Sequence, residues 1–351
     1  MGCIQNKTSL LIVRDIDNSR QEPDDATLNV GLQPALSIVI PARNEEDYLG
    51  MCLDALIMAK NTWGGKHEVI LVDNGSKDST TKIATTKGCR VIEEPDATIS
   101  RLRNVGARNS RGDVIAFLDA DCLVAPEWIV CCLEAFVNEK IGIVGTRAVP
   151  DLNNPTWVEI AWYKLMSGAK RADFPDWIGT SNFFIRREDF FWIGGFDEQL
   201  QTAEDVNLCY ELTRRGRLIY LEQRVDTIHL RESKTLMELF KREYWRGKST
   251  LRSFSRNAFH LKELPSVLFP LLNLLLIFSM FVLAALGSIY VILVFGLAAL
   301  VPAVILIKKQ VSVRSVKRLW QCYVVCLVYG LARSCSLIHE LKHILLNTCS
   351  R

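Results

Sequence analysis

The sequence lacks several patterns that would indicate common classes of protein. No strand-like segment is followed by Gly-x-Gly-x-x-Gly, which argues against a nicotinamide-dependent oxidoreductase. The net charge is only +3 over 351 residues, so the overall charge does not indicate a nucleic-acid partner. The eleven cysteines include no Cys-x-x-Cys pair and no metal-ligand spacing with histidine, and they indicate buried thiols in a reducing compartment. We also expect no secretion signal, because no early apolar segment is long enough.

Hydrophobicity is concentrated near the C-terminus. Residues 264–307 form a run of 44 positions without a charged side chain, about twice the ~20 residues that one helix needs to cross a bilayer. Gly287 and Ser288, near the middle, suit a tight turn, so the run predicts a helical membrane hairpin. A buried helical core is the alternative, and it is disfavoured because soluble cores rarely extend this far without charge. Basic residues flank the run: Arg252, Arg256, Lys262, Lys308, Lys309, Arg314, Lys317 and Arg318.

The arrangement of the membrane region follows from these flanks. Because a hairpin places both of its ends on one face, the positive charge predicts that this face is cytoplasmic. A third apolar segment, residues 319–338, contains Arg333 and is compatible with either a span or an amphipathic helix in the membrane interface, with a span favoured. We expect three regions: a flexible tail over residues 1–34, a central domain over residues 35–255, and a membrane region over residues 263–340.

Strand-like and helix-like segments alternate in the central part of the chain. Helix patterns separate the strand patterns, and Asn44 is expected to cap the first helix. Alternation of this kind predicts an α/β fold with a mainly parallel sheet that binds ligands at its carboxyl edge. The apolar strand patterns occupy residues 36–40, 69–72, 90–92, 114–118 and 141–144.

Two carboxylates follow the strand pattern over residues 114–118. Asp119 and Asp121 are placed where like charges repel one another and are costly to desolvate. A divalent cation that prefers oxygen ligands would offset both costs, and phosphate oxygens often complete its coordination. A solvated acidic turn is the ordinary alternative, because the motif is short. Two other polar clusters are expected at the same sheet edge, over residues 43–45 and 73–74.

Six motifs occur in order along the central part of the chain. They are residues 37–46 (SIVIPARNEE), 72–78 (VDNGSKD), 103–106 (RNVG), 117–121 (FLDAD), 194–198 (GGFDE) and 203–208 (AEDVNL). Together they resemble the motifs of the family 2 glycosyltransferases. The resemblance implies a GT-A fold, a nucleotide-sugar donor and inversion at the anomeric carbon. The Gln-x-x-Arg-Trp motif of processive relatives is absent around Arg246, which argues against a processive synthase.

The resemblance also implies roles for residues of the donor site. Asp119 and Asp121 would hold a divalent cation, Mg2+ or Mn2+, with Asp121 as the more direct ligand. Asp119 would also contribute to binding of the nucleotide-sugar donor. Asp73 would hydrogen-bond the nucleotide base, and Arg103 would lie near the nucleotide or its phosphates. Each has an ordinary alternative, since Asp73 could form a turn and Arg103 could be a solvated helix residue. The first loop would contribute Pro41, Arg43 and Glu45 to the base or ribose.

Inverting transfer also requires a general base that accepts the proton of the acceptor hydroxyl. By resemblance the catalytic pair is Glu204 and Asp205, with Asp205 as the base, and a capping pair at a helix N-terminus is the alternative. His229 would be a third metal ligand or contact the pyrophosphate, although a lone histidine is more often structural. Arg246 would contact the diphosphate.

Together these features predict a membrane-anchored, metal-dependent glycosyltransferase of the hexosyltransferase type. We expect its catalytic domain on the cytoplasmic face of the inner or plasma membrane, which the chain would cross more than once. The hairpin suggests a lipid-linked glycan acceptor, as in exopolysaccharide or cell-envelope synthesis. A polyprenyl-phosphate glycosyltransferase is the first alternative. An inactive membrane scaffold is a second, and the presence of Asp119, Asp121 and Asp205 argues against it.

Overall fold

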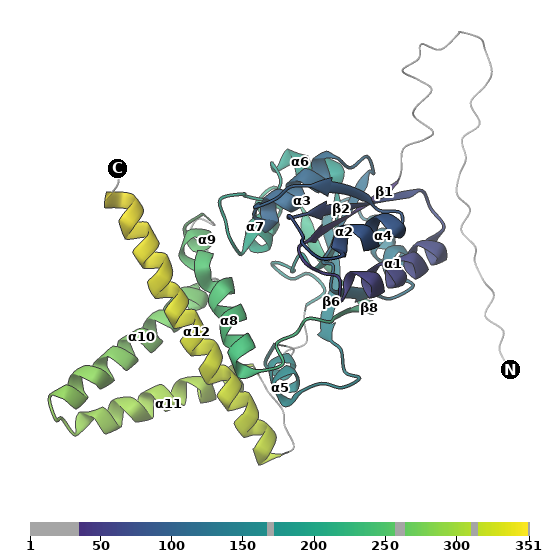
Figure 1. Cartoon of the computed structure of the whole chain (residues 1–351). Coiled ribbons are helices and arrows are strands. Elements are labelled where there is room, and N and C mark those ends of the chain that lie inside the picture. The colour runs from purple at the N-terminus through teal and green to yellow at the C-terminus, as the bar shows by residue number, and fades with distance from the viewer. Residues whose placement is uncertain (1–34, 167–171, 257–263, 310–314, 350–351) are drawn as a thin grey trace, which may run out of the picture. The chain divides into compact units, whose positions relative to one another are not determined.

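The computed structural model describes residues 35–166, 172–256, 264–309 and 315–349 (Figure 1). The expected tail over residues 1–34, Lys262 and Arg314 lie outside these residues. The strands are β1 (Leu36–Ala42), β2 (His67–Asp73), β3 (Arg90–Glu93), β4 (Val114–Leu118), β5 (Cys122–Val124), β6 (Ile141–Pro150), β7 (Asn182–Arg186) and β8 (Leu218–His229). The helices before the long apolar run are α1 (Leu49–Trp63), α2 (Thr80–Thr86), α3 (Ile99–Arg108), α4 (Trp128–Ala135), α5 (Trp157–Met166), α6 (Arg187–Trp192), α7 (Glu204–Arg214), α8 (Leu236–Arg246), the 3-10 helix η1 (Gly247–Ser249) and α9 (Thr250–Arg256).

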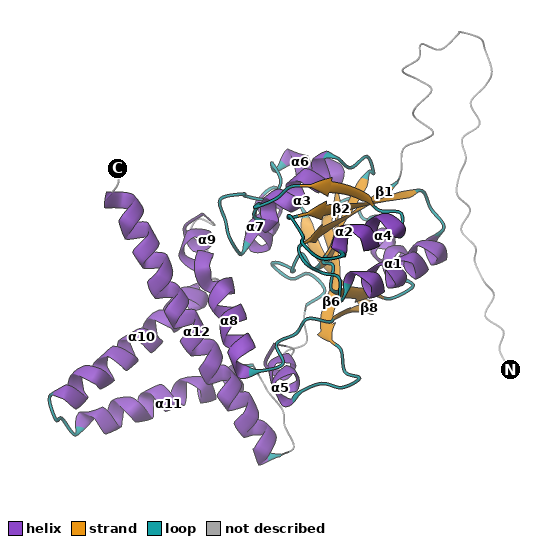
Figure 2. Cartoon of the chain, in the orientation of Figure 1, coloured by secondary structure: helices purple, strands orange, loops and turns teal. Residues whose placement is uncertain are grey.

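The described strands form one mixed sheet of eight strands, in the order β3-β2-β1-β4-β7-β6-β8-β5 (Figure 2). Strands β3, β2, β1 and β4 run parallel to one another, as the alternation of strands and helices predicts. Strand β7 is antiparallel to β4 and β6, and β5 is antiparallel to β8. The carboxyl ends of β1, β2 and β4 therefore meet at one edge, where the polar clusters were expected.

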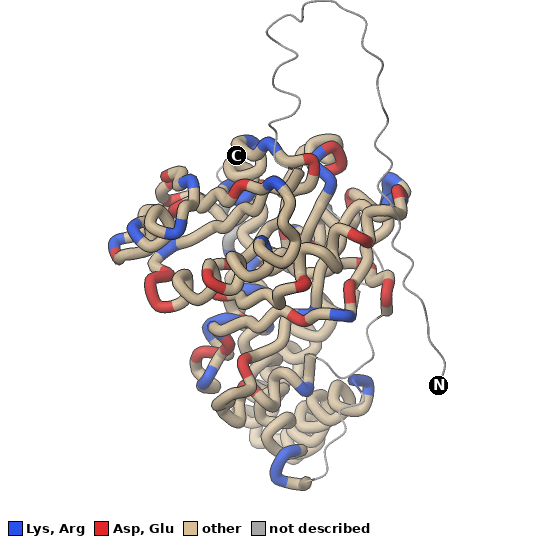
Figure 3. Tube along the Cα trace, turned by 90° about the vertical axis from the view of Figure 1, so that its right-hand side faces the viewer, with Lys and Arg blue, Asp and Glu red and all other residues tan. Residues whose placement is uncertain are grey.

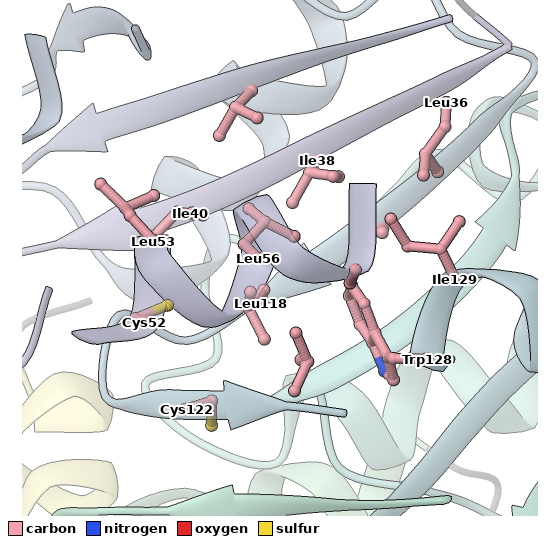
Figure 4. Close-up of a cluster of buried hydrophobic side chains, with 14 of the residues drawn as sticks. Leu36, Ile38, Ile40, Cys52, Leu53, Leu56, Leu118, Cys122, Trp128 and Ile129 are labelled. Atoms are coloured by element: carbon pink, nitrogen blue, oxygen red, sulfur yellow. The ribbon is translucent and has the colours of Figure 1, made fainter. Parts of the chain in front are cut away.

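Alternate residues of β1 and β4 enter two hydrophobic cores, one on each face of the sheet. Ile38 and Ile40 pack with α1 and with Trp128 of α4 in the first core (Figure 4). Val39, between them, packs with Phe117 in the second core, which also includes residues of α3 and α7. Burying side chains of this size contributes roughly 1.5–3 kcal/mol each. The two covered faces explain why these strands are continuous apolar runs.

Helix α3 lies very close to β1. A Cβ on Gly106 would lie 2.2 Å from Val39 Cγ1 and 3.2 Å from Val72 Cγ2, so a larger residue would push the helix from the sheet. Arg103 lies three residues earlier on the same helix. Gly106 therefore determines how closely α3, and with it Arg103, approaches the sheet.

One local prediction is wrong. The first helix begins at Leu49, with Tyr48 before it, and not directly after Asn44. Asn44 has a left-handed φ of 53°, and its Oδ1 accepts a hydrogen bond of 2.9 Å from the Lys77 backbone N–H. Asparagine tolerates this conformation, and its amide bonds a distant turn in preference to a helix end. The loop after β1 is thereby attached to the turn after β2.

Among the described residues, three helices follow α9: α10 (Leu264–Ala285), α11 (Tyr290–Lys308) and α12 (Val316–Cys349). All three contain segments long and apolar enough to cross a membrane, with hydropathies of 2.5, 2.8 and 1.4. Charged positions, coloured in Figure 3, are absent from α10 and, apart from Lys308, from α11. A turn containing Gly287, whose φ is 62°, joins α10 to α11, and the two helices contact one another.

The two helical glycines Gly106 and Gly50 make a matched test of the α3 contact. We expect Gly106→Ala to destabilise the protein by about 1–3 kcal/mol, because the new methyl group overlaps Val39. Gly50→Ala should be neutral or stabilising, because nothing lies within 4 Å of its Cβ position and alanine favours helix. Thermal unfolding of the two purified variants measures the difference, and equal melting temperatures would contradict the packing argument.

Candidate active site

Arg103 of α3 joins two carboxylates from distant parts of the chain. Its Nη1 donates to Glu204 Oε1 at 2.7 Å, and its Nη2 donates to Asp119 Oδ1 at 2.9 Å. The Arg103 residue is 3% exposed, so this cation is buried and is compensated by both partners. Asp119 follows β4 and Glu204 begins α7, so the arginine fixes the start of α7 beside the end of the strand. Arg103 is therefore not the solvated helix residue of the ordinary alternative.

Asn104, the next residue, attaches a second loop to α3. Its Nδ2 donates to the Phe196 carbonyl at 2.8 Å and to Glu198 Oε1 at 2.9 Å, while its Oδ1 accepts from the Phe196 N–H at 2.9 Å. Phe196 and Glu198 belong to the 194–198 motif, so two of the six motifs are joined by these hydrogen bonds.

Asp121 and His229 face one another across two paired strands. Strand β5 pairs with β8 so that Cys122 lies opposite His229, and Asp121 Oδ1 lies 3.6 Å from His229 Nε2. One ligand atom from each of Asp121, Cys122 and His229 lies within 4.8 Å of the others, close enough to hold a metal ion. Burial raises the pKa of Asp121, and the nearby Asp119 raises it further, although His229 opposes the shift. A cation would relieve the cost of this buried negative charge.

The donor set favours some metals over others. The Asp121 carboxylate fits a hard cation such as Mg2+ or Mn2+, and imidazole is a common metal ligand. Burial holds the pKa of the Cys122 thiol well above its usual range, so the thiol stays protonated and is a poor partner for a hard cation. The residues present therefore fit a divalent cation held by Asp121 and His229. Asp119 is not part of this cluster of ligand atoms, and its Oδ1 accepts a hydrogen bond from Arg103.

Asp73 ends β2 with one oxygen bonded and the other free. Its Oδ2 accepts a hydrogen bond of 2.9 Å from the Ser76 N–H, as a turn-forming aspartate would. Its Oδ1 is buried and has no hydrogen-bond partner among the described residues. An unsatisfied buried acceptor is costly, so this atom indicates a ligand that donates a hydrogen bond.

The first loop supplies Pro41, Arg43 and Glu45 at the same edge. Pro41 is buried within β1 opposite Val72, and Arg43 is exposed. Glu45 Oε1 accepts from Arg231 Nη1 at 2.7 Å, whereas Glu45 Oε2 is buried without a partner among the described residues. Burial raises the pKa of Glu45 to about 7, against the opposing effect of Arg231.

Asp205 is the second residue of α7, after Glu204. Ala203, the residue before the helix, has a left-handed φ of 63°. Asp205 Oδ1 accepts a hydrogen bond of 2.8 Å from the N–H of Val206, the next residue. Burial and the neighbouring Glu204 raise the pKa of Asp205 to about 7, which is the range expected of a general base. A carboxylate at a helix N-terminus is also favoured electrostatically, so the capping role and the catalytic role are compatible.

The loop before Asp205 is bound to η1. Ser249 Oγ accepts from the backbone N–H groups of Gln201 and Thr202 at 3.2 and 3.3 Å. Thr202 Oγ1 in turn donates to the Arg246 carbonyl at 3.0 Å. The Arg246 side chain donates to Glu243 Oε1 at 2.8 Å, and its charge lowers the pKa of Asp205. Arg246 therefore lies on the Asp205 side of the site.

Sequence reasoning missed three charged residues that surround His229. Arg231 pairs with Glu45, and Arg242 donates to both oxygens of Glu232 at 2.6 and 3.0 Å. Glu232 Oε1 lies 3.8 Å from His229 Nδ1. The available signal was the charged stretch directly after the histidine, but no sequence pattern shows that α8 folds back onto it.

The buried ion pairs of Arg103 can be tested against an exposed pair on the same helix. We expect Arg103→Met to destabilise the protein by about 3–5 kcal/mol, because two carboxylates lose their cation. Arg101→Met should lower the melting temperature only slightly, since Arg101 is half exposed in its pair with Glu94. Thermal unfolding in excess chelator measures both, and similar losses in the two variants would contradict the bridging role.

Comparison with known proteins identifies similar sequences. Residues 37–192 match the family model described as Glycosyl transferase family 2. Glycosyltransferase AglE of Haloferax volcanii is 26% identical over 237 residues, covering 62% of this chain and 74% of that protein. Undecaprenyl-phosphate 4-deoxy-4-formamido-L-arabinose transferase of Edwardsiella ictaluri is 33% identical over 123 residues, covering 32% of this chain and 36% of that protein. Chondroitin synthase of Pasteurella multocida is 25% identical over 203 residues, covering 54% of this chain and 20% of that protein.

A solved structure has the same architecture. The mannosyltransferase PcManGT from Pyrobaculum calidifontis, in complex with GDP-Man and Mn2+, has a TM-score of 0.60 at 16% identity. The match covers 86% of this chain and 87% of that chain, and it concerns the fold. The resemblance in the sequence motifs is confirmed: the chain carries a family 2 glycosyltransferase domain with a GT-A fold, followed by helices that are long and apolar enough to span a membrane.

Proposed function

We propose that this protein transfers a sugar, with inversion, from a nucleotide-sugar donor to a lipid-linked glycan acceptor at the cytoplasmic face of a membrane. The observation that carries the proposal is the pair of hydrogen bonds from Arg103 to Asp119 and Glu204. These bonds bring the candidate metal motif and the candidate base, Asp205, into one site. A scaffold that merely occupied the membrane would not need a buried arginine between these two motifs.

Asp119, Asp121 and His229 would hold a divalent cation. The short distance between Asp121 and His229 supports the set, as does the raised pKa of Asp121. Such a cation, when bound, would act as a Lewis acid on the departing nucleoside diphosphate. Arg103 orients Asp119, and Glu204 holds Arg103 in place.

The donor would lie along the carboxyl ends of β1 and β2. The free Oδ1 of Asp73 would accept a hydrogen bond from the nucleotide base, and Pro41, Arg43 and Glu45 would contact the base or ribose. Arg246 would approach the diphosphate from α8. The neighbour that was solved with GDP-Man and Mn2+ supports a nucleotide-sugar donor, at the level of the fold.

Asp205 would accept the proton of the acceptor hydroxyl as that oxygen attacks the anomeric carbon. Its raised pKa suits this step, because a base with a pKa near the working pH is most effective. Glu204 helps to raise the pKa by its own negative charge. The proton moves from the hydroxyl to Asp205, and the bond between the anomeric carbon and the diphosphate breaks.

The acceptor and the membrane arrangement follow from the C-terminal helices. Helices α10 and α11 would cross the membrane as a hairpin, and the basic residues at its open end would place the catalytic domain in the cytoplasm. A polyprenyl phosphate is the second candidate acceptor. It is favoured by the similarity to the undecaprenyl-phosphate transferase, which is limited to 32% of this chain.

A donor screen tests the metal and the transfer together. We expect the purified full-length protein to release a nucleoside diphosphate from one nucleotide sugar, faster with a lipid-linked glycan than with a polyprenyl phosphate. Excess chelator should abolish release, and Asp121→Asn should weaken binding of the metal and nucleotide. Asp226→Asn is the matched control, because Asp226 pairs with Arg147 at the surface. Full activity in chelator would contradict the cation, and no release from any donor would favour a scaffold.

The base can be tested by substitution and by pH. We expect Asp205→Asn to lower kcat by at least about a hundredfold while donor binding is nearly unchanged. Because the base must be deprotonated and its pKa is raised to about 7, kcat/KM of the wild type should fall as the pH drops below about 7.

Two comparisons make this test decisive. Glu211→Gln, on the exposed side of α7, should keep near-normal turnover, because Glu211 forms a surface pair with Arg214. Since asparagine caps a helix as well as aspartate, near-normal turnover of folded Asp205→Asn would mean that Asp205 acts only as a cap.

A further inference from the structure

Helix α12 packs against the catalytic domain along most of its length. Near its start, Cys322 and Val325 share a hydrophobic cluster with Val158 and Leu165 of α5. Near its end, Glu340 accepts hydrogen bonds from the backbone N–H groups of α9, at 2.9 and 3.0 Å. Between these points, α12 contacts α8 and η1.

These contacts are spread too far along α12 to lie at one end of a helix that spans a membrane. Val325 and Glu340 are separated by 15 positions, or about 22 Å at 1.5 Å per residue. The hydrocarbon core of a bilayer is about 30 Å thick, so an upright α12 would carry α8 and α9 into it. Helix α8 contains Glu238, Lys241, Arg242, Glu243 and Arg246 among its eleven residues, and burying such a segment in lipid is prohibitively costly.

The two long faces of α12 have opposite character. The face toward the catalytic domain includes Ser336 and Glu340, both buried. The opposite face exposes Trp320, Leu327, Leu331 and Ile338, which are spaced by seven, four and seven residues and therefore form one stripe.

The contacts between α12 and the hairpin also argue against an upright α12. Ser334 Oγ donates to the Pro270 carbonyl at 3.2 Å, in the second turn of α10, and α12 also packs against Leu306, near the end of α11. The longer Tyr323 side chain reaches the Ala299 carbonyl at 2.7 Å. In Figure 1, α12 runs across the open end of the hairpin and not alongside α10 and α11.

We infer that α12 does not cross the membrane but lies in its interface, with the stripe of Trp320, Leu327, Leu331 and Ile338 against the lipid acyl chains. We expect lipid to cover this stripe, because the stripe adjoins a hairpin that is itself apolar all round. The 34 residues of α12 extend about 51 Å, which exceeds the thickness of the hydrocarbon core. This arrangement differs from the span that the sequence favoured, and it leaves the C-terminal end of α12 on the catalytic side.

Epitope tags in the full-length chain test the inference in sealed vesicles. One tag is inserted in the exposed turn at Gly64, one between Gly287 and Ser288, and one after residue 351. We expect protease to reach the Gly64 and C-terminal tags from the same side, and the Gly287 tag only from the other. A C-terminal tag on the side of Gly287 would overturn the inference. If the Gly287 insertion prevents folding, the Gly64 and C-terminal tags alone decide.

Photocrosslinking identifies what covers the stripe. With p-benzoylphenylalanine at Trp320 or Ile338, we expect adducts with radiolabelled phospholipid, whereas the same group at the buried Val325 should give adducts within the chain. Adducts at Trp320 and Ile338 with a second copy of the protein, or an absence of lipid adducts, would overturn the inference.

The inference rests on the membrane anchoring proposed above and not on sugar transfer, and neither readout needs turnover. A Gly287 tag on the catalytic side would reject the hairpin separately from α12.

Discussion

The buried pair of hydrogen bonds made by Arg103 is the interaction on which the site depends. A buried guanidinium must be compensated, and here one carboxylate comes from the end of β4 and the other from the start of α7. The desolvation of three charges offsets much of the attraction, so the pair contributes more to geometry than to net stability. Its effect is to hold the Asp119 motif and the Glu204–Asp205 motif in a fixed relation, with α3 itself seated on β1 through Gly106.

Negative charge exceeds positive charge around this arginine. Burial and neighbouring carboxylates raise the pKa values of Asp121 and Asp205, and burial raises that of Glu45. A diphosphate would be repelled from such a site unless a cation lay between it and the aspartates. Burial is the main cause of the raised pKa of Asp205, and the negative charge of Glu204 raises it further, into the range of a general base. Buried carboxylates thus support both proposed roles.

Much of the fold could be predicted from the sequence because local patterns determine it. The apolar runs of β1 and β4 are buried on both faces, so their position and the edge where their polar residues lie follow from composition. Asn44 was misjudged because its hydrogen bond goes to Lys77, 33 residues away, and local capping rules do not include such partners. Arg103 bonds Glu204 across 101 residues of sequence and Arg231 bonds Glu45 across 186, so these partners could not be derived from spacing.

Hydropathy has a similar limit at the membrane. It measures how apolar a segment is, and α12 is apolar enough to qualify as a span, but it does not show what the polar face contacts. The buried Glu340 bonds the first turn of α9, which follows directly on Ser249, and Ser249 binds the loop before Asp205. A helix that lay upright in lipid could not make these contacts without dehydrating α8. The membrane helix and the candidate base are therefore connected through packed, hydrogen-bonded protein, and an acceptor held at the lipid surface would meet a site at a fixed height above it.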